Sequence, residues 1–399
     1  MGRIDKRYDV LVVGGGINGV GVAQAAAAVG HSVLLLEKTE LAAGTSSKSS
    51  KLIHGGLRYL ESWEFGLVQE GLSERALMLR LAPDLVELKP FYIPVFEYTR
   101  RQPWLVRAGL GFYAVLGKLR KEVRFRKVPR RRWDELDGLV TDKLAAVFCY
   151  WDAQADDAAL TAAVWKSAEG LGAKLAMPAE FIGAEILDDG CAVHYRQGER
   201  EITCQARVLV NAAGPWVNRV LSAIDPPQTQ RRVQLVQGSH IIVGGQVEHG
   251  IYYVEVPRDG RAAFVMPWKG QTLVGTTETR FRGDPDDVRP LRAERSYLRR
   301  VLNRYFPRYN ATGPEAVLDA FAGLRVLPAG PGHAFHRSRE TILDVDVDGK
   351  KDHPHVLSIY GGKLTSWRAT AEKVMSRIEG SLPARKRAID TRTIRLTPP

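Results

Sequence analysis

The chain has 399 residues, 45% of them hydrophobic and 26% charged, which is typical of a globular enzyme with about two domains and argues against a disordered protein. Lys and Arg number 57 against 45 Asp and Glu, so the net charge of +12 favours phosphorylated substrates, nucleic acid or acidic lipid as partners. Cys149, Cys191 and Cys204 have no zinc-ligand or CxxC spacing, so we expect no metal site and a reducing, cytoplasmic location.

The first predicted element is a βαβ unit. Residues 8–13 form a β-rich run, the alanine-rich residues 20–29 suit a helix, and residues 32–36 form a second strand that ends at Glu37. Residues 10–36 contain no charged side chain and are numerous enough to span a membrane. Their glycines and their division into strand, turn and helix favour the βαβ unit over membrane insertion.

Three glycines between the first strand and the helix have dinucleotide-binding spacing. Gly14 permits the tight turn, Gly16 lets the backbone approach a pyrophosphate, and Gly19 lets helix and strand pack closely. The helix N-terminus offers free N–H groups to the phosphates. Glu37 can accept hydrogen bonds from ribose hydroxyls. The motif alone does not distinguish FAD from NAD.

A hydroxyl-rich stretch follows the second strand. Residues 44–51 read GTSSKSSK and continue as LIHGGLRYLE at residues 52–61. This string closely resembles the FAD-dependent glycerol-3-phosphate dehydrogenases, within the amino-acid-oxidase-like flavoprotein superfamily. Further motifs follow in the family's order at residues 151–158, 211–216, 238–240, 275–277, 323–325 and 361–365. The resemblance covers roughly residues 8–375.

The resemblance implies an FAD site. Its implied cofactor-binding residues are Gly14, Gly16, Gly19, Glu37, Thr45, Ser46, Ser47, Lys51, Leu52, His54, Ala213, Gly214, Gly362, Lys363, Leu364 and Thr365. The strand at residues 208–210 runs into a glycine turn that can bring backbone against a flat ring. Gly361 and Gly362 are expected to open a helix over residues 364–378, whose N–H groups and Lys363 would stabilise a reduced flavin.

A phosphorylated alcohol is the substrate that the resemblance implies. Hydride transfer to a flavin requires the alcohol carbon over N5 and a group that accepts the hydroxyl proton. Arginine forks match phosphate oxygens well. The substrate-side residues that the resemblance implies are Arg58, Tyr59, Arg325, Arg339 and Lys363. His54 and His240 are both candidate proton acceptors, and the sequence does not choose between them.

The sequence departs from the family pattern in three places. Val326 stands where a proline is common, and Glu278 where an aspartate is common. The chain ends at Pro399 without the helical C-terminal domain that family members usually carry. These departures leave substrate identity, membrane attachment and oligomeric state open.

A basic segment lies in the first half of the chain. Residues 118–132 hold nine Lys or Arg and one acid, Glu122, after an apolar and aromatic run at residues 104–116. This pattern suits an interfacial helix on the acidic inner face of the cell membrane, which fits the family's transfer of electrons to membrane quinone. A packed helix followed by a solvated loop is the alternative. No nucleic-acid recognition motif accompanies the charge.

We expect an α/β fold with a Rossmann-like FAD-binding domain and an interleaved, mainly antiparallel α+β substrate domain. The expected FAD-binding domain comprises residues 1–90, 145–220 and 325–399, and the substrate domain residues 91–144 and 221–324. Strands are expected in the substrate domain at residues 233–243, 251–256, 262–267 and 272–276.

The expected activity is FAD-dependent oxidation of sn-glycerol 3-phosphate to dihydroxyacetone phosphate, by hydride transfer to N5 with electrons passed to quinone. One alternative is a related oxidase that acts on an amine or 2-hydroxy acid and uses oxygen. The other is a flavin-binding protein without turnover.

Overall fold

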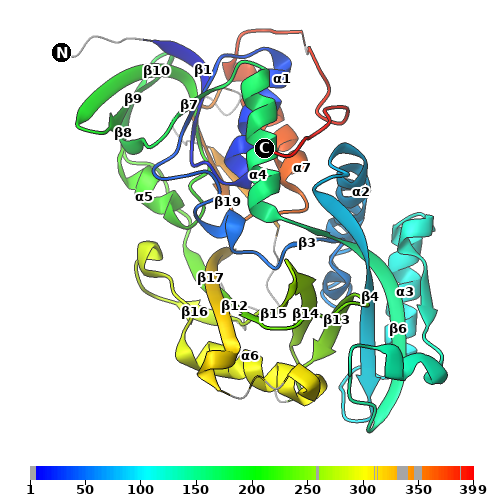
Figure 1. Ribbon diagram of the computed structural model, residues 1–399. Coiled ribbons are helices and arrows are strands. Elements are labelled where there is room, and N and C mark those ends of the chain that lie inside the picture. Colours follow the sequence, from blue (N-terminus) through cyan, green and yellow to red (C-terminus); the bar gives the residue numbers. More distant parts are fainter. Residues whose placement is uncertain are drawn as a thin grey trace.

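The computed structural model of the protein describes residues 6–257, 260–309, 311, 313–329, 340–345, 353–386 and 388–399. Its described elements form two sheets, one above the other in Figure 1, with helices on the outer faces of both. This arrangement confirms the expected α/β fold class with one Rossmann-like part and one mainly antiparallel part.

The first sheet has the strand order β11-β8-β9-β10-β1-β2-β7, with β19 also beside β10 and β18 beside β19. Its strands are β1 Arg7–Val13, β2 Val33–Leu36, β7 Lys174–Ala176, β8 Glu180–Leu187, β9 Gly190–Gln197, β10 Arg200–Asn211, β11 Ile224–Asp225, β18 Ile342–Val345 and β19 Val356–Tyr360. β1 pairs in parallel with β2 and β10, and β10 with β19. The carboxyl ends of these central strands therefore meet at one edge of the sheet.

Helix α1 (Ile17–Val29) is buried along almost its whole length. It packs against α4 (Asp157–Gly170) and α7 (Trp367–Ile378) on one side of the first sheet (Figure 1). Its alanine-rich sequence allows this close approach, and Trp367 lies where a Cβ on Gly21 would stand. Gly30 ends the helix with a left-handed conformation at φ 96°.

The second sheet has the order β16-β12-β15-β14-β13-β4-β6-β3, with β17 beside β12 and β5 beside β6. Its strands are β3 Leu52–Ile53, β4 Val86–Phe96, β5 Phe125–Lys127, β6 Leu144–Ala155, β12 Val233–Val243, β13 Ile251–Glu255, β14 Ala262–Trp268, β15 Gln271–Gly275, β16 Thr279–Phe281 and β17 Val317–Pro328. The pairing of β4 with β13 is parallel, and the other pairings of the described strands in this sheet are antiparallel.

Three helices flank the second sheet: α2 (Phe65–Leu81), α3 (Pro103–Leu116) and α6 (Arg292–Tyr305). α2 and α3 pack on one another beside β4 and β6, while α6 lies below β12 (Figure 1). A short helix, α5 (Val217–Ser222), follows β10 in the first sheet's half of the molecule.

Most expected elements are present, with one correction. β12 has the expected bounds, β13 and β14 differ from expectation by one residue at one end, and β15 is shifted by one residue at both ends. The helix expected from Leu364 begins instead at Trp367, because Lys363 to Ser366 form a turn in which the Ser366 N–H donates to the Lys363 carbonyl. The domain ranges stay a prediction, and β3 and β6 pair within the second sheet.

Candidate cofactor and substrate site

The glycines of the turn after β1 have two different roles: some are required by the backbone fold, and one leaves space for a ligand. Gly14 has φ 108°, and a Cβ on Gly19 would stand 1.9 Å from the Gly14 carbonyl oxygen, so both glycines are needed by the fold itself. Gly16 has an ordinary extended conformation, and a Cβ there would meet only Ser46 Oγ, at 3.0 Å. The missing side chain of Gly16 therefore leaves space for a ligand at the N-terminus of α1.

Glu37 lies at the end of β2, beside this turn. Its Oε2 accepts a hydrogen bond from the Gly15 N–H (2.7 Å), and its Oε1 accepts one from the Thr39 N–H (2.8 Å). Oε1 also accepts from the Thr39 hydroxyl (3.3 Å). These bonds fix the carboxylate at the carboxyl end of the strand and leave Oε2 a lone pair for a ribose hydroxyl.

The hydroxyl-rich loop runs along the same edge of the sheet. Thr45 to Ser47 form a short 3-10 helix, in which Ser46 Oγ accepts from the Ile17 N–H (2.9 Å). Thr45 Oγ1 donates to the Leu324 carbonyl (2.8 Å), which joins the loop to β17. Ser47 lies in the middle of the loop and Leu52 is buried in β3.

Lys51 makes a buried ion pair within the protein. Its Nζ lies 2.6 Å from Asp157 Oδ1 and donates to the Ser47 carbonyl at 2.7 Å. Both side chains are almost completely buried, and Asp157 also accepts from Ser49. This pair holds the loop against α4, so a direct role for Lys51 toward a cofactor stays a prediction.

Two more turns reach the same edge. Ala213 and Gly214 begin a 3-10 helix after β10, and Gly214 has φ 55°. Gly361 and Gly362 follow β19 with φ 79° and 106°. A Cβ on Gly14 would stand 2.8 Å from the Ala212 carbonyl oxygen, so the glycine turn after β1 is in contact with the turn after β10.

Asn18, which the sequence analysis missed, joins the glycine turn of α1 to the turn at Gly361. Its Nδ2 donates to the Gly361 carbonyl (3.3 Å) and lies where a Cβ on Gly362 would stand. Asn18 Oδ1 and Ser366 Oγ are buried and have no hydrogen-bond partner in the described part of the chain. A polar amide between two glycines of an otherwise apolar helix start was the available signal.

The residues at this edge fit FAD on two grounds. Gly16 leaves a space beside the free N–H groups of α1, and buried polar atoms of Asn18 and Ser366 await partners. Thr365 joins the turn after β19 to the loop that carries His54, because its Oγ1 accepts a hydrogen bond from the His54 N–H (3.1 Å). Leu364 is half-buried.

The GGLRY string forms a turn that places Tyr59 against Lys363. Gly56 is left-handed at φ 75°, and the Tyr59 ring occupies the space of its absent side chain. Lys363 Nζ stands 4.6 Å from the centroid of the Tyr59 ring, in cation–π contact. Arg58, in the same 3-10 turn, is half-buried.

Arg325 extends from β17 toward the strand β12. Its Nη1 lies 3.2 Å from Glu278 Oε1, and its Nη2 donates to the Thr277 carbonyl at 2.9 Å. Gly238 on β12 leaves room for the guanidinium, which a Cβ there would meet at 2.4 Å. The side chain is 23% exposed, so it is not sealed from solvent. Arg339 lies outside the described residues.

His240 is buried on β12. Its Nε2 stands 2.9 Å from Ser50 Oγ, and its ring stacks on Phe321 with centroids 4.9 Å apart. Burial, and then the charges of Arg325 and Lys51, lower the pKa of His240 to about 3. The imidazole is therefore neutral at neutral pH, and its Nδ1 has no partner in the described part of the chain. His54 is half-buried in the loop.

Glu294 on α6, a second residue that the sequence analysis missed, supports this region from below. Its carboxylate accepts from Ser239 Oγ (2.6 Å), Thr277 Oγ1 (2.7 Å), Thr279 Oγ1 (2.7 Å) and Gln237 Nε2 (2.6 Å). Burial opposes ionisation, but hydrogen bonds led by that of Ser239 hold the pKa of Glu294 below its usual value. Glu294 thus ties the neighbour of His240 to the neighbour of Glu278.

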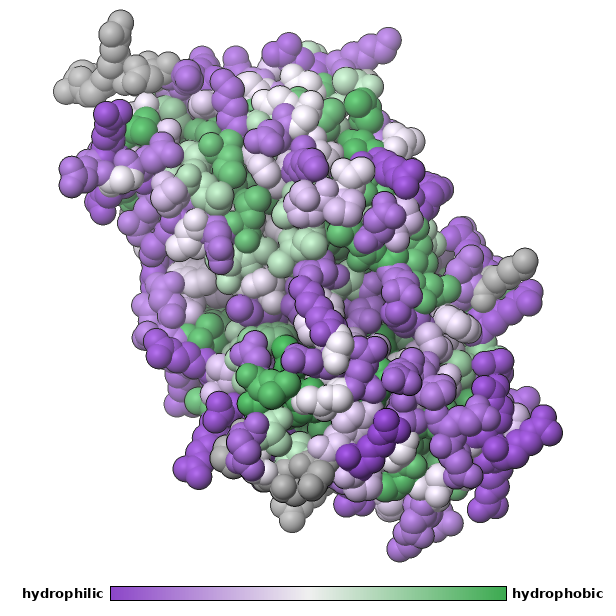
Figure 2. Space-filling view, viewed as in Figure 1, coloured by the Kyte–Doolittle hydropathy of each residue, from purple (hydrophilic) through white to green (hydrophobic). Residues whose placement is uncertain are grey.

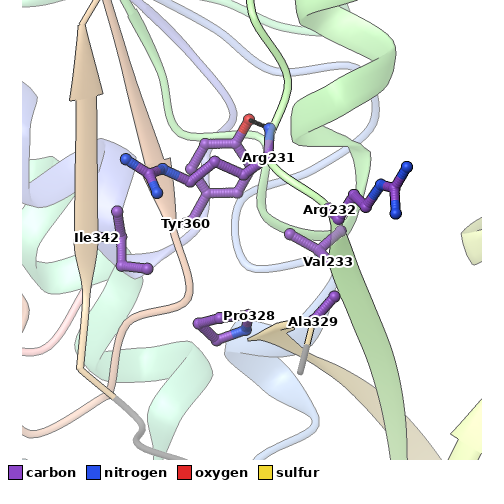
Figure 3. A pocket seen from close by; sticks show the side chains of 7 residues that line it. All are labelled: Arg231, Arg232, Val233, Pro328, Ala329, Ile342 and Tyr360. Atoms are coloured by element: carbon purple, nitrogen blue, oxygen red, sulfur yellow. Dashed lines mark hydrogen bonds between the residues drawn. The ribbon is translucent and has the colours of Figure 1, made fainter. Parts of the chain in front are cut away.

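A pocket of about 280 Å³ lies where β12 begins and β17 ends (Figure 3). Its lining residues are Arg231, Arg232, Val233, Pro328, Ala329, Ile342 and Tyr360. The Arg231 N–H donates to the Tyr360 hydroxyl (3.2 Å), and its side chain pairs with Asp344 (2.8 Å). The pocket adjoins the glycine turn after Tyr360 but includes none of the residues expected to hold cofactor or substrate.

Comparisons with known proteins agree with these features. A family model described as FAD dependent oxidoreductase matches residues 9–376. The chain is 38% identical to D-erythritol 1-phosphate dehydrogenase of Brucella abortus, over 94% of this chain and 74% of that protein. It is 37% identical to glycerol-3-phosphate dehydrogenase of Pseudomonas aeruginosa, over 93% of this chain and 72% of that protein.

Solved structures are similar over nearly the whole chain. The glycerol-3-phosphate dehydrogenase of Bacillus halodurans complexed with FAD has a TM-score of 0.74 and 26% identity, covering 98% of this chain and 68% of that chain. An L-alpha-glycerophosphate oxidase of Mycoplasma pneumoniae with FAD bound has a TM-score of 0.75, and the match covers 96% of this chain and 97% of that chain. Its identity is 17%, so this second match concerns the fold alone.

Proposed function

The chain belongs to the family of FAD-dependent oxidoreductases, and from that premise we propose that it oxidises sn-glycerol 3-phosphate to dihydroxyacetone phosphate. FAD supplies the hydride acceptor, N5 of its flavin ring. The observation that carries the proposal is a pair of cations beside the turns that we propose bind FAD: Lys363 against Tyr59, and Arg325 on the nearby strand β17.

Two contacts support a common site for Lys363 and Arg325. A Cβ on Gly361 would stand 3.3 Å from the Val326 carbonyl oxygen, so the turn before Lys363 lies against the strand that carries Arg325. The Thr45 bond to Leu324 brings the hydroxyl-rich loop to the same strand. In the proposal, Arg325, Lys363 and Arg58 bind the substrate phosphate and Tyr59 orients Lys363.

The substrate hydroxyl loses a proton as its carbon gives up the hydride, so a group must accept that proton. Both His54 and His240 are near the proposed site. Because its pKa is about 3, His240 holds a proton only weakly in the described arrangement. Replacing each histidine with Gln and comparing the pH dependence of flavin reduction distinguishes the two: the acid limb disappears in the variant that lacks the acceptor.

D-Erythritol 1-phosphate is a second candidate substrate, because a dehydrogenase named for it is 38% identical to this chain. Both compounds pair a phosphate with a neighbouring carbinol, so the same cations would serve either. The test is to add glycerol 3-phosphate, D-erythritol 1-phosphate, glycine or lactate to the purified protein without oxygen and to follow the flavin absorbance. Bleaching by glycerol 3-phosphate supports the proposal, bleaching by D-erythritol 1-phosphate alone favours the second substrate, and bleaching by glycine or lactate alone favours the oxidase alternative.

We also propose that electrons pass to quinone and that the protein contacts the acidic inner face of the cell membrane through α3. This helix is apolar on two faces and buries one of them, through Val106, Leu110, Tyr113 and Ala114. Its other face exposes Trp104 (71%), Leu105, Phe112 and Val115. Ring contacts from Phe112 to Phe65 and from Phe65 to Trp63 extend this apolar surface, and Trp63 is 79% exposed.

One cation lies on this helix and most of the others follow it in the sequence. Among the described residues, Arg107, Lys118, Arg120, Arg124, Arg126, Lys127, Arg130 and Arg131 form no salt bridge with a carboxylate. Figure 2 shows hydrophilic side chains gathered along the lower right edge, over the lower part of β6, which pairs with the strand of Arg126 and Lys127. An apolar helix face with basic neighbours is typical of contact with acidic lipid.

No helix within the described ranges is long and apolar enough to cross a bilayer. The membrane test therefore measures surface binding, by co-sedimentation with vesicles of phosphatidylglycerol and phosphatidylcholine or of phosphatidylcholine alone. Trp104→Ser should weaken binding to the acidic vesicles. Leu318→Ser, which removes an exposed apolar side chain from β17, should leave it unchanged. Equal binding to both vesicles, or none, contradicts the proposed contact.

A further inference from the structure

The loop that carries Arg58 and Tyr59 is anchored by a tyrosine hydroxyl from α3. Tyr113 Oη accepts a hydrogen bond from the Gly55 N–H (3.0 Å) and donates one to Asp152 Oδ2 (2.7 Å). Tyr113, Asp152 and Gly55 are all buried. A Cβ on Gly55 would stand 2.6 Å from the same hydroxyl, so the first glycine of the GGLRY string makes this bond possible.

A buried arginine completes the network. Arg75 on α2 donates through Nη1 to Asp152 Oδ1 (2.7 Å) and to the Trp151 carbonyl (3.0 Å). Its Nη2 reaches the Glu122 carbonyl (3.4 Å), at the start of the basic segment. Asp152 therefore keeps a cationic partner even without Tyr113. These contacts give Asp152 of the Trp151–Asp152 motif a structural role, whereas, in the described part of the chain, Trp151 takes part only through its backbone carbonyl.

The same helix turn faces two ways. Tyr113 points into the network, while its neighbour Phe112 is exposed and contacts the Phe65 ring at 5.0 Å between centroids. A helix turn moves as a unit, because its backbone hydrogen bonds keep adjacent side chains in fixed relation. Any shift of α3 that follows contact at its exposed face thus displaces the hydroxyl that holds Gly55.

We propose that Tyr113 is a positioning residue for the substrate loop, residues 54–59, and that contact at the exposed face of α3 reaches the loop through it. The part of this inference that concerns Arg58 and Tyr59 rests on the proposed function, and the part that concerns α3 rests on the proposed membrane contact. The Tyr113 hydroxyl sets the Gly55–Gly56 turn, and that turn sets where Arg58 and Tyr59 lie. Surface contact at α3 then stabilises the loop in its described arrangement.

The test compares Tyr113→Phe with Tyr150→Phe. Tyr150 packs edge-on against Tyr113 at 6.0 Å and is equally buried, but it makes no hydrogen bond to Gly55 or Asp152 in the described structure. Amide hydrogen exchange of peptides covering residues 52–60 is measured on the FAD-loaded protein, with and without phosphatidylglycerol vesicles. This readout needs no substrate, so it remains decisive even if glycerol 3-phosphate fails to reduce the flavin.

Tyr113→Phe should speed exchange at Gly55 about tenfold, because one hydrogen bond to the amide is lost, while Tyr150→Phe leaves it unchanged. Acidic vesicles should slow this exchange in the wild type and not in Tyr113→Phe. Apparent affinity for glycerol 3-phosphate should fall about tenfold in Tyr113→Phe with FAD content retained. Equal exchange in Tyr113→Phe and wild type overturns the positioning role. Wild-type exchange that is unchanged at vesicle concentrations that co-sediment the protein overturns the coupling alone, and absence of co-sedimentation overturns the membrane contact and the coupling together.

Discussion

Replacing Arg325 with alanine separates a phosphate-binding arginine from a structural one. The variant removes the guanidinium that stands 3.2 Å from Glu278 Oε1 and donates to the Thr277 carbonyl. That ion pair is partly exposed, so its loss should cost the folded state about 1 kcal/mol or less. A charge-assisted contact to substrate phosphate contributes about 1.5–3 kcal/mol, so kcat/KM should fall about 10- to 150-fold.

The assay measures kcat/KM for glycerol 3-phosphate, FAD content and thermal unfolding on one preparation. Arg325→Lys should recover only part of the activity, because a point charge does not reproduce a planar fork. Arg280→Ala is the matched control: Arg280 lies on the other side of the same β12 residue, Val236, and is exposed. A stable, flavin-loaded Arg325→Ala variant with wild-type kinetics would remove Arg325 from the substrate site.

Three further perturbations follow from the same geometry. Gly16→Val should fold normally and lose FAD, because its side chain would fill the space left for the ligand. Gly19→Ala should instead lose about 1–3 kcal/mol of stability, because its Cβ would stand 1.9 Å from a backbone oxygen. FAD content and thermal unfolding are measured for both variants, and normal FAD content in Gly16→Val would contradict the role of Gly16. Burial lowers the pKa of His240 from 6.5 to about 3, so as pH falls the unfolded chain binds a proton at this residue before the folded protein does. The free energy of unfolding should therefore be about 2 kcal/mol lower at pH 5 than above pH 6.5. The His240→Gln variant, measured by urea unfolding at both pH values, should lack this part of the decrease. Glu294→Gln should lower the free energy of unfolding by about 1–3 kcal/mol and raise KM for the substrate, because it weakens the hydrogen bonds from Ser239 and Thr277. Urea unfolding and steady-state kinetics measure the two effects. If neither quantity changes, Glu294 does not support the site.

Local signals in the sequence were sufficient for the elements that hold the dinucleotide turn. The spacing of Gly14, Gly16 and Gly19 and the acid at Glu37 depend on backbone geometry within one βαβ unit, and the structure places them together. The strand β12 was predictable from its β-branched run. The predicted start of α7 is wrong by three residues, because the Ser366 N–H donates to the Lys363 carbonyl in a turn and the helix begins only after this turn.

The supporting residues were not predictable from local patterns. Glu294 has the pattern of a first-turn helix acid, and only the folded chain brings Ser239 and Thr277 onto it. Tyr113 fits the apolar stripe of α3, and its bond to Gly55 spans 58 positions in the sequence. Such contacts depend on the packing of distant segments, which periodicity and composition do not encode.

The most direct test of the proposed function is the second-order rate constant for bleaching of the bound flavin without oxygen, measured at sub-saturating alcohol and compared between glycerol 3-phosphate and glycerol. The cations Arg325, Lys363 and Arg58 should favour the phosphorylated alcohol by at least about tenfold in the second-order rate constant, the contribution of a single charge-assisted contact. Equal rate constants for the two alcohols, in protein that carries its full complement of FAD, would contradict the proposed phosphate site and with it the proposed substrate.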